Sequence, residues 1–161
     1  MKNDSLRFTD NNLYKVIISK DAYECMREYC KSSNFNETGG ILIGNYSNDQ
    51  KTANILKVTP APQNSHKTKC TFRRGTVGLK DILDTMWEKG LYYLGEWHYH
   101  PKASSLPSGT DINQMVRFAN SSDLKCPEPI LVIIGEELGE ESMFVGVFNK
   151  KDYVRLQEFN M

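Results

Sequence analysis

Histidine is scarce in this sequence, and neither sign of charge predominates. The chain of 161 residues holds 20 Lys and Arg against 20 Asp and Glu, so its formal net charge is zero. Without a basic excess, nothing in the charge indicates nucleic acid or an anionic membrane as a partner. Only three histidines are present, and two that fall close together are therefore informative.

Long apolar runs are also missing. The N-terminal segment MKNDSLRFTDNN has no hydrophobic stretch of the kind that a secretory signal requires. The most apolar segments, residues 40–44 and 130–135, are far too short to cross a bilayer. No two of the four cysteines form a C-x-x-C pair. We therefore expect a cytoplasmic protein with free thiols.

The length and the ordinary composition predict one globular domain, residues 1–161. Apolar runs that indicate strands alternate with amphipathic stripes that indicate helices. The strands are expected at residues 14–18, 37–44, 53–59, 70–73, 91–98, 129–134 and 143–148, and the helices are expected to begin near Ser19, Leu79 and Ser108. Residues 60–69 indicate a surface loop, and the acidic residues 136–141 indicate the loop of a hairpin. The order is that of a mixed α/β domain built in layers.

The most informative stretch surrounds a pair of histidines. His98 and His100 are two residues apart, which places both rings on one face if the segment is extended. Pro101 favours that geometry, because the residue before a proline is biased toward β conformation. Two imidazoles at the end of a strand can reach one metal ion, although such a pair can also be structural or exposed to solvent.

Asp111 is the candidate for a third ligand. The loop of residues 101–107 is long enough to fold back, and Ser108 opens a helix whose first turn contains Asp111. Three protein ligands with one position left for water are typical of catalytic zinc, and this mixture of N and O donors suits zinc better than magnesium or calcium. Ser108-x-x-Asp111 also matches a helix capping box. Both interpretations can hold together, because a cap fixes the helix start that aims Asp111.

Hydrolysis needs a base that takes a proton from water and later passes it to the leaving group. Glu37 is the candidate, since it stands at the mouth of a strand bracketed by glycines, although a glutamate before a strand is often simply solvated. Ser108 can donate a hydrogen bond to the developing oxyanion. Glu96 is a rival to Glu37, because strand parity places it on the face of His98. It is less attractive as the base, but it can orient an imidazole from behind the ligands.

Together these residues resemble the JAMM (MPN+) metalloprotease motif. Glu37 is followed by His98-x-His100 and, after seven residues, by Ser108-x-x-Asp111. The resemblance covers roughly residues 13–150. It implies an α/β fold of the JAB/MPN (cytidine-deaminase-like) type, with a single-domain curved mixed β-sheet flanked by helices. It also implies a zinc-dependent isopeptidase that cuts after the C-terminus of a ubiquitin-like protein.

Within the family, the segments LGEWHYHP at 94–101 and FRR at 72–74 look most like small stand-alone bacterial members. These include the deconjugating proteases of anti-phage operons, both type II CBASS and ubiquitination-like systems, in which E1- and E2-like enzymes are neighbours. Tyr99 departs from the usual Ser or Thr, but parity points it away from the metal. Lys102 after Pro101 disfavours the RadC-like branch. The partners implied are a protein substrate with an extended C-terminal tail and, by operon, E1/E2-like enzymes.

The loop of residues 60–75 is a candidate flap over such a tail, which can bind by adding a strand to an exposed sheet edge. Its basic side chains are Lys67, Lys69, Arg73 and Arg74. They either contact acidic groups of the substrate or form a solvated loop. Two other functions stay open: a module that binds a ubiquitin-like tail around a structural metal, and a peptidase that matures a precursor. A thiol protease is disfavoured, because no recognisable pattern pairs Cys70 with a histidine.

Overall fold

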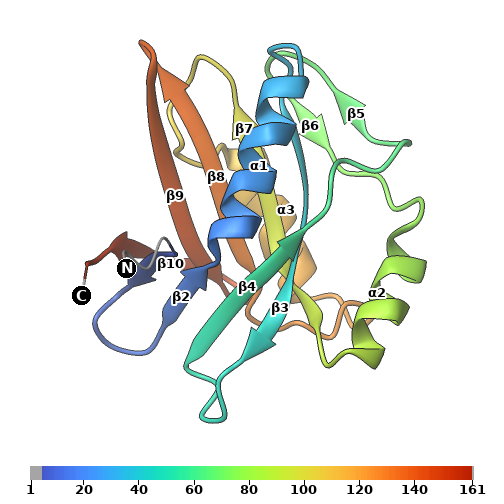
Figure 1. The fold of residues 1–161 in the computed structure, drawn as a ribbon, viewed down its shortest axis with the longest axis vertical. Helices are drawn as coiled ribbons and strands as arrows, with labels where there is room; N and C mark the ends of the chain where they lie inside the picture. Colours follow the sequence, from blue (N-terminus) through green and yellow to red (C-terminus); the bar gives the residue numbers. More distant parts are fainter. Residues whose placement is uncertain (1–4, 161) are drawn as a thin grey trace.

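The structure is a computed structural model that describes residues 5–160. The described chain has ten strands and three helices, whose arrangement Figure 1 shows. In chain order they are β1 Leu6–Thr9, β2 Lys15–Ile18, α1 Lys20–Ser32, β3 Thr38–Tyr46, β4 Thr52–Val58, β5 His66–Lys67, β6 Phe72–Arg73, α2 Leu79–Glu88, β7 Tyr92–His100, α3 Gly109–Ala119, β8 Ile130–Glu137, β9 Glu140–Phe148 and β10 Tyr153–Glu158.

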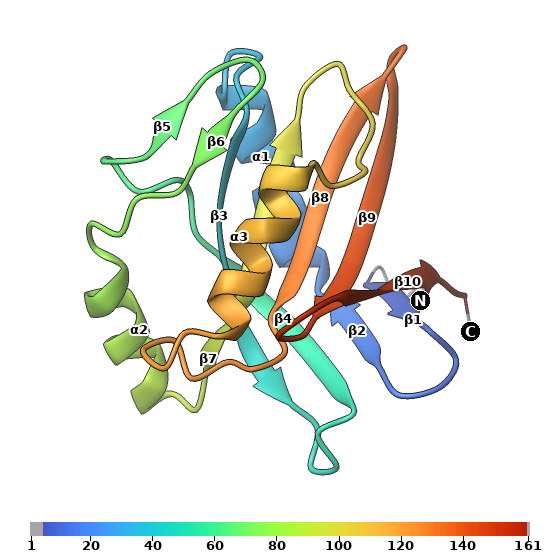
Figure 2. The same cartoon turned by 180° about the vertical axis from the view of Figure 1, so that it is seen from behind.

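Eight strands close into a barrel in the order β1-β10-β9-β8-β7-β3-β4-β2, while β5 and β6 form a separate hairpin. The sheet is mixed, because β7 and β8 run parallel, as do β2 and β4, and the other neighbours are antiparallel. The expected mixed sheet flanked by helices is therefore confirmed, but its closure into a barrel was not predicted. The closing strands β1 and β10 lie outside the segment that carries the family resemblance (Figure 2).

The two closing strands leave little trace in the sequence. Phe8 is the only fully buried side chain of β1, and Leu156 is the only one of β10. A single inward residue gives no alternating pattern from which a strand can be predicted. Both strands are instead specified by pairing, since β1 pairs with both β2 and β10.

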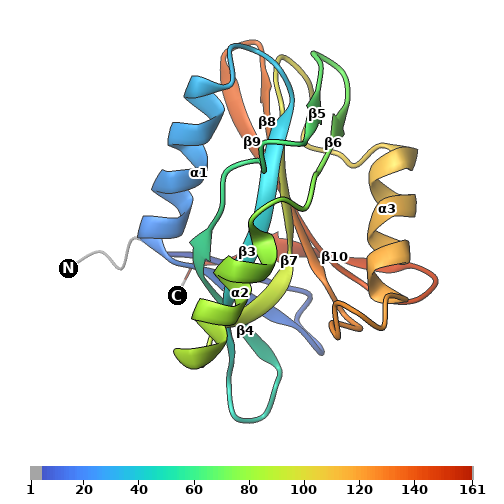
Figure 3. The same cartoon turned by 90° about the vertical axis from the view of Figure 1, so that its right-hand side faces the viewer.

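The helices lie on both faces of the curved sheet, as Figure 3 shows for α1 and α3. Strand β8 illustrates the alternation that makes this possible. Val132 faces inward to a core that includes Met26 of α1. Leu131 and Ile133 face outward and pack with Met115 of α3. Helix α2 covers β3 and β7 on this outer face. No helix in residues 5–160 combines the length and apolarity needed to cross a membrane.

The predicted helix starts at Ser19, Leu79 and Ser108 are confirmed, and capping residues mark several of the boundaries. Ser19 precedes α1 and accepts a hydrogen bond from the backbone N–H of Ala22 at 3.1 Å. Gly90 follows α2 with a φ of +74°, the left-handed conformation that ends many helices. Ser108 precedes α3 in a complete capping box. The third cap bears directly on the candidate metal site, because it fixes the start of α3.

The acidic hairpin differs from its prediction. Strand β8 continues through Glu137 and β9 begins at Glu140, so the turn consists of Leu138 and Gly139. The acidic side chains therefore belong to paired strand residues at the exposed end of a long hairpin, not to a loop. These residues show no apolar alternation, and hence no strand signal, because both faces of this end of the hairpin are exposed.

Candidate metal centre

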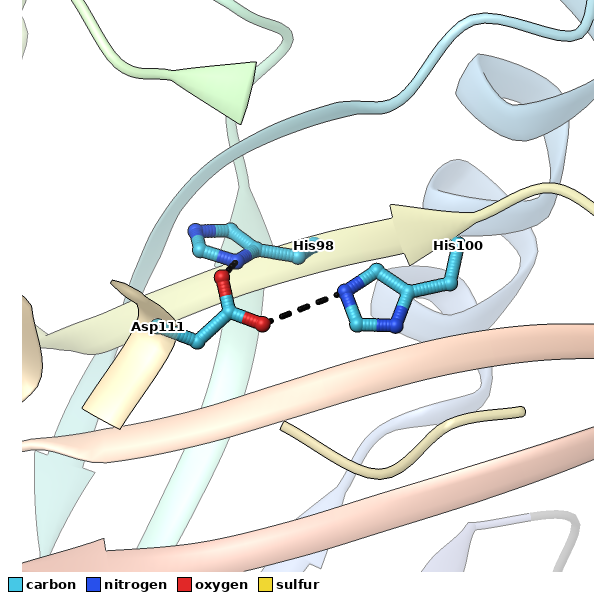
Figure 4. A group of neighbouring side chains, drawn as sticks. All are labelled: His98, His100 and Asp111. Carbon is cyan, nitrogen blue, oxygen red and sulfur yellow. Dashed lines mark ion pairs between the residues drawn. The ribbon is translucent and has the colours of Figure 1, made fainter. Parts of the chain in front are cut away.

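Strand β7 presents both candidate histidines on its outer face. The strand runs through His100, so the extended geometry expected from Pro101 is present, and His98 and His100 point the same way (Figure 4). Asp111 reaches them from the first turn of α3. One candidate ligand atom from each of the three residues lies within 4.8 Å of the other two. The structure thus brings together the three residues expected to hold the metal.

His98 is buried and lacks conventional partners. Its exposed fraction is 1%, and neither ring nitrogen makes a hydrogen bond to any residue in the range 5–160. Its Nδ1 lies 3.3 Å from Oδ1 of Asp111. Buried polar atoms without a partner are costly and uncommon in folded proteins. An ion bound at this position would satisfy the ring, and the environment of His98 therefore fits a metal ligand.

His100 is oriented by the loop that follows it. Its Nδ1 lies 3.0 Å from the backbone oxygen of Ser104, and a carbonyl oxygen only accepts, so Nδ1 carries the proton. The other nitrogen, Nε2, lies 3.3 Å from Oδ2 of Asp111. A backbone carbonyl that orients an imidazole in this way is typical of metal-binding histidines. The role of Ser104 could not be predicted from the sequence, because a backbone acceptor is independent of residue type.

Asp111 is held as a carboxylate despite its burial. Burial raises its pKa, but the nearby rings of His100 and His98 and the hydrogen bond from the backbone N–H of Ser108 outweigh that effect, so the pKa is lowered. The N–H of Ser108 donates to Oδ2 at 2.9 Å, and the N–H of Asp111 donates to Oγ of Ser108 at 3.1 Å. The capping box and the ligand geometry therefore use the same carboxylate, and both interpretations of the motif hold.

Glu37 lies beside the three ligand residues without joining them. Its Oε1 is 3.9 Å from Nε2 of His100, and its side chain is 15% exposed. Burial raises the pKa of Glu37, the charge of Asp111 adds to the rise, and His100 opposes it. Two left-handed residues before it, Asn34 and Phe35 with φ of +56° and +60°, turn the chain from α1 into β3. A carboxylate so placed is compatible with the role of a base beside the three ligand residues.

Ser108 stands exposed at the rim of this cluster. Its Oγ accepts from the N–H of Asp111, which uses a lone pair and leaves the hydroxyl hydrogen available. Within the described chain that hydrogen has no acceptor. The position is compatible with donation to a substrate oxygen as well as with the helix cap.

Glu96 does not have the outer-partner role expected of it. It is fully buried on β7 and forms an ion pair with Arg74, and the hydroxyl of Tyr93 donates to its second oxygen. No hydrogen bond joins Glu96 to His98 among the residues described. Arg74 is accordingly a correction to the expected basic surface cluster: its side chain is 5% exposed. The remaining basic residues of that cluster are exposed, namely Lys67, Lys69 and Arg73.

A glycine allows β3 to approach the histidine strand. Gly39 lies opposite His98 in the ladder between β3 and β7. A Cβ at this position would lie 2.2 Å from the backbone oxygen of Trp97 and 2.8 Å from the ring of Phe72. Neither neighbour can move far, because the oxygen belongs to the backbone and the ring is buried.

We expect Gly39→Ala to disturb the site through this contact. Overpacking of this kind costs about 1–3 kcal/mol of folding stability, and the displaced strand would also weaken metal binding. Thermal unfolding and metal content measure the two effects. Gly109→Ala is the control, since a Cβ there meets nothing within 4 Å. Equal stability of the two variants would contradict the close approach.

The chemistry of the three ligand side chains tests whether a metal fits between His98, His100 and Asp111. Two imidazoles and one carboxylate match the three-ligand pattern of catalytic zinc, which keeps a fourth position open. They do not match magnesium or calcium, which prefer oxygen ligands. The ring nitrogens of His98 have no hydrogen-bond partner among the described residues, and the proton of His100 lies on Nδ1, which leaves the lone pair of Nε2 free. Both observations favour a cation between the two rings. The cysteines are not part of this cluster, and all four are free thiols.

Comparison with known proteins agrees with this geometry. Residues 19–146 match the family model described as prokaryotic homologs of the JAB domain. A protein of Enterobacter hormaechei named "CD-NTase/cGAS isopeptidase" is 42% identical over 152 residues, which cover 93% of this chain and 84% of that protein. A "probable metalloprotease" of Sinorhizobium fredii is 28% identical over 102 residues, 61% of this chain and 62% of that protein.

A solved structure shares the fold. The solution structure of protein DSY2949 from Desulfitobacterium hafniense superposes with a TM-score of 0.65 at 20% identity. The match covers 86% of this chain and 87% of that one. At this identity the likeness concerns the fold alone. The family match and the names of the relatives support a hydrolase and imply a metal. The cluster of His98, His100 and Asp111 is a possible site for it.

Proposed function

Because the chain belongs to the prokaryotic homologs of the JAB domain, we propose that it is a zinc-dependent isopeptidase. It hydrolyses the bond after the C-terminus of a ubiquitin-like or similarly conjugated protein. The observation that carries this proposal is the buried cluster of His98, His100 and Asp111 with Glu37 beside it. The relatives named "CD-NTase/cGAS isopeptidase" support the reaction type. We further propose that the enzyme acts in a cytoplasmic anti-phage pathway, where it reverses or matures conjugation and E1/E2-like enzymes are its neighbours.

The metal is held by His98, His100 and Asp111 in this proposal. When bound, zinc supplies a Lewis acid that polarises a carbonyl and makes water a better nucleophile. The chain's own part is to fix the three side chains in advance. The carbonyl of Ser104 fixes the ring of His100, and the cap of α3 fixes the carboxylate of Asp111.

Glu37 moves the proton. Its Oε1 takes a proton from the attacking water and delivers it to the amine nitrogen that leaves. Ser108 donates its hydroxyl hydrogen to the oxygen that develops negative charge at the scissile carbonyl. Since water is the nucleophile, no covalent acyl-enzyme forms, and the cysteines take no part. The same chemistry serves an isopeptide bond and a precursor peptide bond.

The β5–β6 hairpin is the proposed flap for the substrate tail. It lies beside the site: the edge of the Phe72 ring packs on His98 with centroids 5.3 Å apart, and the N–H of Glu37 donates to the oxygen of Thr68 at 2.8 Å. In the described chain β6 pairs only with β5, so its outer edge can accept an extended tail as an added strand. The exposed basic residues of the hairpin, Lys67 and Arg73 among them, would face acidic groups of the conjugate.

Substitutions at Ser108 separate its two roles. Ser108→Ala should cost about 1 kcal/mol of stability because the cap is lost, whereas glycine at an N-cap costs only a few tenths. Both variants lack the hydroxyl, so both should lower kcat by about 10²–10³. Thermal unfolding and single-turnover cleavage measure these effects. A Ser108→Gly variant with full activity would leave Ser108 as a cap only.

The proposal is tested with wild-type protein, metal analysis and a model fusion that carries a ubiquitin-like C-terminal tail. We expect one zinc per chain, loss of cleavage after chelation, and recovery when zinc is returned. Protein that binds zinc and the tail but never cuts it would be the tail-binding module with a structural metal. Protein purified without metal that cleaves equally well would refute the scheme.

A further inference from the structure

The β5–β6 hairpin is joined to the barrel by few contacts. Its strands have two residues each and pair only with one another within residues 5–160. Phe72 is buried, while the other residues from His66 to Arg73 are exposed. An isolated two-stranded hairpin is at best marginally stable in water. Contacts outside the hairpin must therefore hold it beside the site (Figure 2).

Two of those contacts have the same two-residue spacing on the hairpin segment and on β7. Phe72 and Arg74 are two residues apart and point inward, while Arg73 between them points to solvent. On β7 the partners are also two residues apart: the ring of Phe72 packs on His98, and Nε of Arg74 donates to Glu96. If the hairpin slipped by one residue, Arg73 or Gly75 would take the place of Arg74, and Thr71 or Arg73 would take the place of Phe72. Neither register would keep both the aromatic contact with His98 and the ion pair with Glu96.

The inner end of this arrangement is a closed polar network. Arg74 and Glu96 have side chains 5% and 1% exposed. Nη1 of Arg74 also donates to the oxygen of Gly75 at 2.8 Å, and the hydroxyl of Tyr93 donates to Oε2 of Glu96. A bulge at Leu94 makes this possible, because the extra residue in the ladder puts Tyr93 and Glu96 on one face. A buried ion pair is specific about geometry, since misalignment leaves both charges unpaired.

The same guanidinium reaches the helix that carries Asp111. It lies 5.2 Å from the ring centroid of Phe118 on α3. Arg74 thus contacts β7, which carries both histidines, and α3, which carries the third ligand, while it is itself the residue that follows β6. No other side chain named at the site links these three elements.

We propose that the Arg74–Glu96 pair anchors the β5–β6 hairpin in a single register over the metal strand. Arg74 and Glu96 are then positioning residues. They act through Phe72, which they seat against His98, and through the oxygen of Thr68, which they seat on the N–H of Glu37. The anchoring is a property of the free chain, whereas its consequence for substrate rests on the proposed function.

Hydrogen exchange of the full-length, metal-free chain tests the anchoring without any substrate. Arg74→Met keeps the length of the side chain and removes the charge, and Arg73→Met makes the same change at the exposed neighbour. We expect amides of residues 66–73 and of Glu37 to exchange about tenfold faster or more in the first variant. Amides of β8 and β9 should be unchanged, and Arg73→Met should match wild type.

Two results would overturn the anchor. Equal hairpin exchange in the two methionine variants would show that the pair does not hold it. Faster exchange throughout the barrel, with no excess in the hairpin, would make Arg74 an ordinary core residue. If Arg74→Met fails to fold, Arg74→Lys and Glu96→Gln decide the question, because both keep a polar partner in place. Each should loosen the hairpin alone, and exchange as in wild type would equally overturn the anchor.

Kinetics then test the consequence for substrate. With a fusion that carries a ubiquitin-like tail, Arg74→Met should raise KM about tenfold and lower kcat by a smaller factor, because the hairpin also contacts His98 and Glu37. Arg74→Lys should recover part of the loss. A fall in kcat with unchanged KM would contradict a flap role. Failure of cleavage in wild type would refute the proposed function instead, and the exchange result would stand apart from it.

Discussion

Asp111→Asn should cost the protein its metal while leaving its fold nearly intact. The amide oxygen of asparagine can still accept from the N–H of Ser108, so the cap of α3 survives. The negative charge between the two histidines is lost, and an uncharged amide is a poor ligand for zinc. Removal of even an outer partner of a metal ligand costs about 10–100-fold in affinity, so loss of a ligand should exceed about 100-fold.

Zinc titration and cleavage of the model fusion measure that loss, with circular dichroism to follow the fold. Asp84→Asn on α2 is the matched control, since Asp84 is an exposed partner of Lys80 and is not one of the three clustered residues. The control should bind zinc as wild type does. Wild-type zinc affinity in Asp111→Asn would contradict the assignment of Asp111 as a ligand.

The ligand residues were accessible to sequence reasoning because local rules place them. Parity on an extended segment puts His98 and His100 on one face, and a capping box sets where α3 begins, so Asp111 is aimed before any tertiary contact is known. The family resemblance, which the comparisons confirm, rests on the same spacing. Ser104 lay beyond such rules, because any residue supplies the backbone oxygen that orients His100.

Arg73 and Arg74 show where the local rules end. The two are identical in type and adjacent, yet one is exposed and the other is buried against Glu96. Which of them points inward depends on how a two-residue strand docks on β7, and the composition of the loop does not decide that. The barrel closure by β1 and β10 escaped prediction for a related reason: each strand is specified mainly by its partners.

Glu37→Gln should abolish turnover and keep the metal. The variant preserves the size of the side chain but removes the group that accepts and returns a proton. General acid–base catalysis of this kind contributes about 10²–10⁴-fold to the rate, and kcat should fall by that factor. Zinc should stay bound at one per chain, because Oε1 of Glu37 is 3.9 Å from His100 and outside the three-residue cluster.

Metal analysis and single-turnover cleavage, measured on the same preparation, test whether Glu37 is the base. Glu28→Gln on the exposed face of α1 is the matched control and should behave as wild type, since its side chain is 72% exposed. Loss of zinc together with activity would make Glu37 a ligand and would require a different base. Full activity with zinc retained would move the proton transfer to another group, and Glu96 could not supply it, because Arg74 and Tyr93 already occupy both of its oxygens.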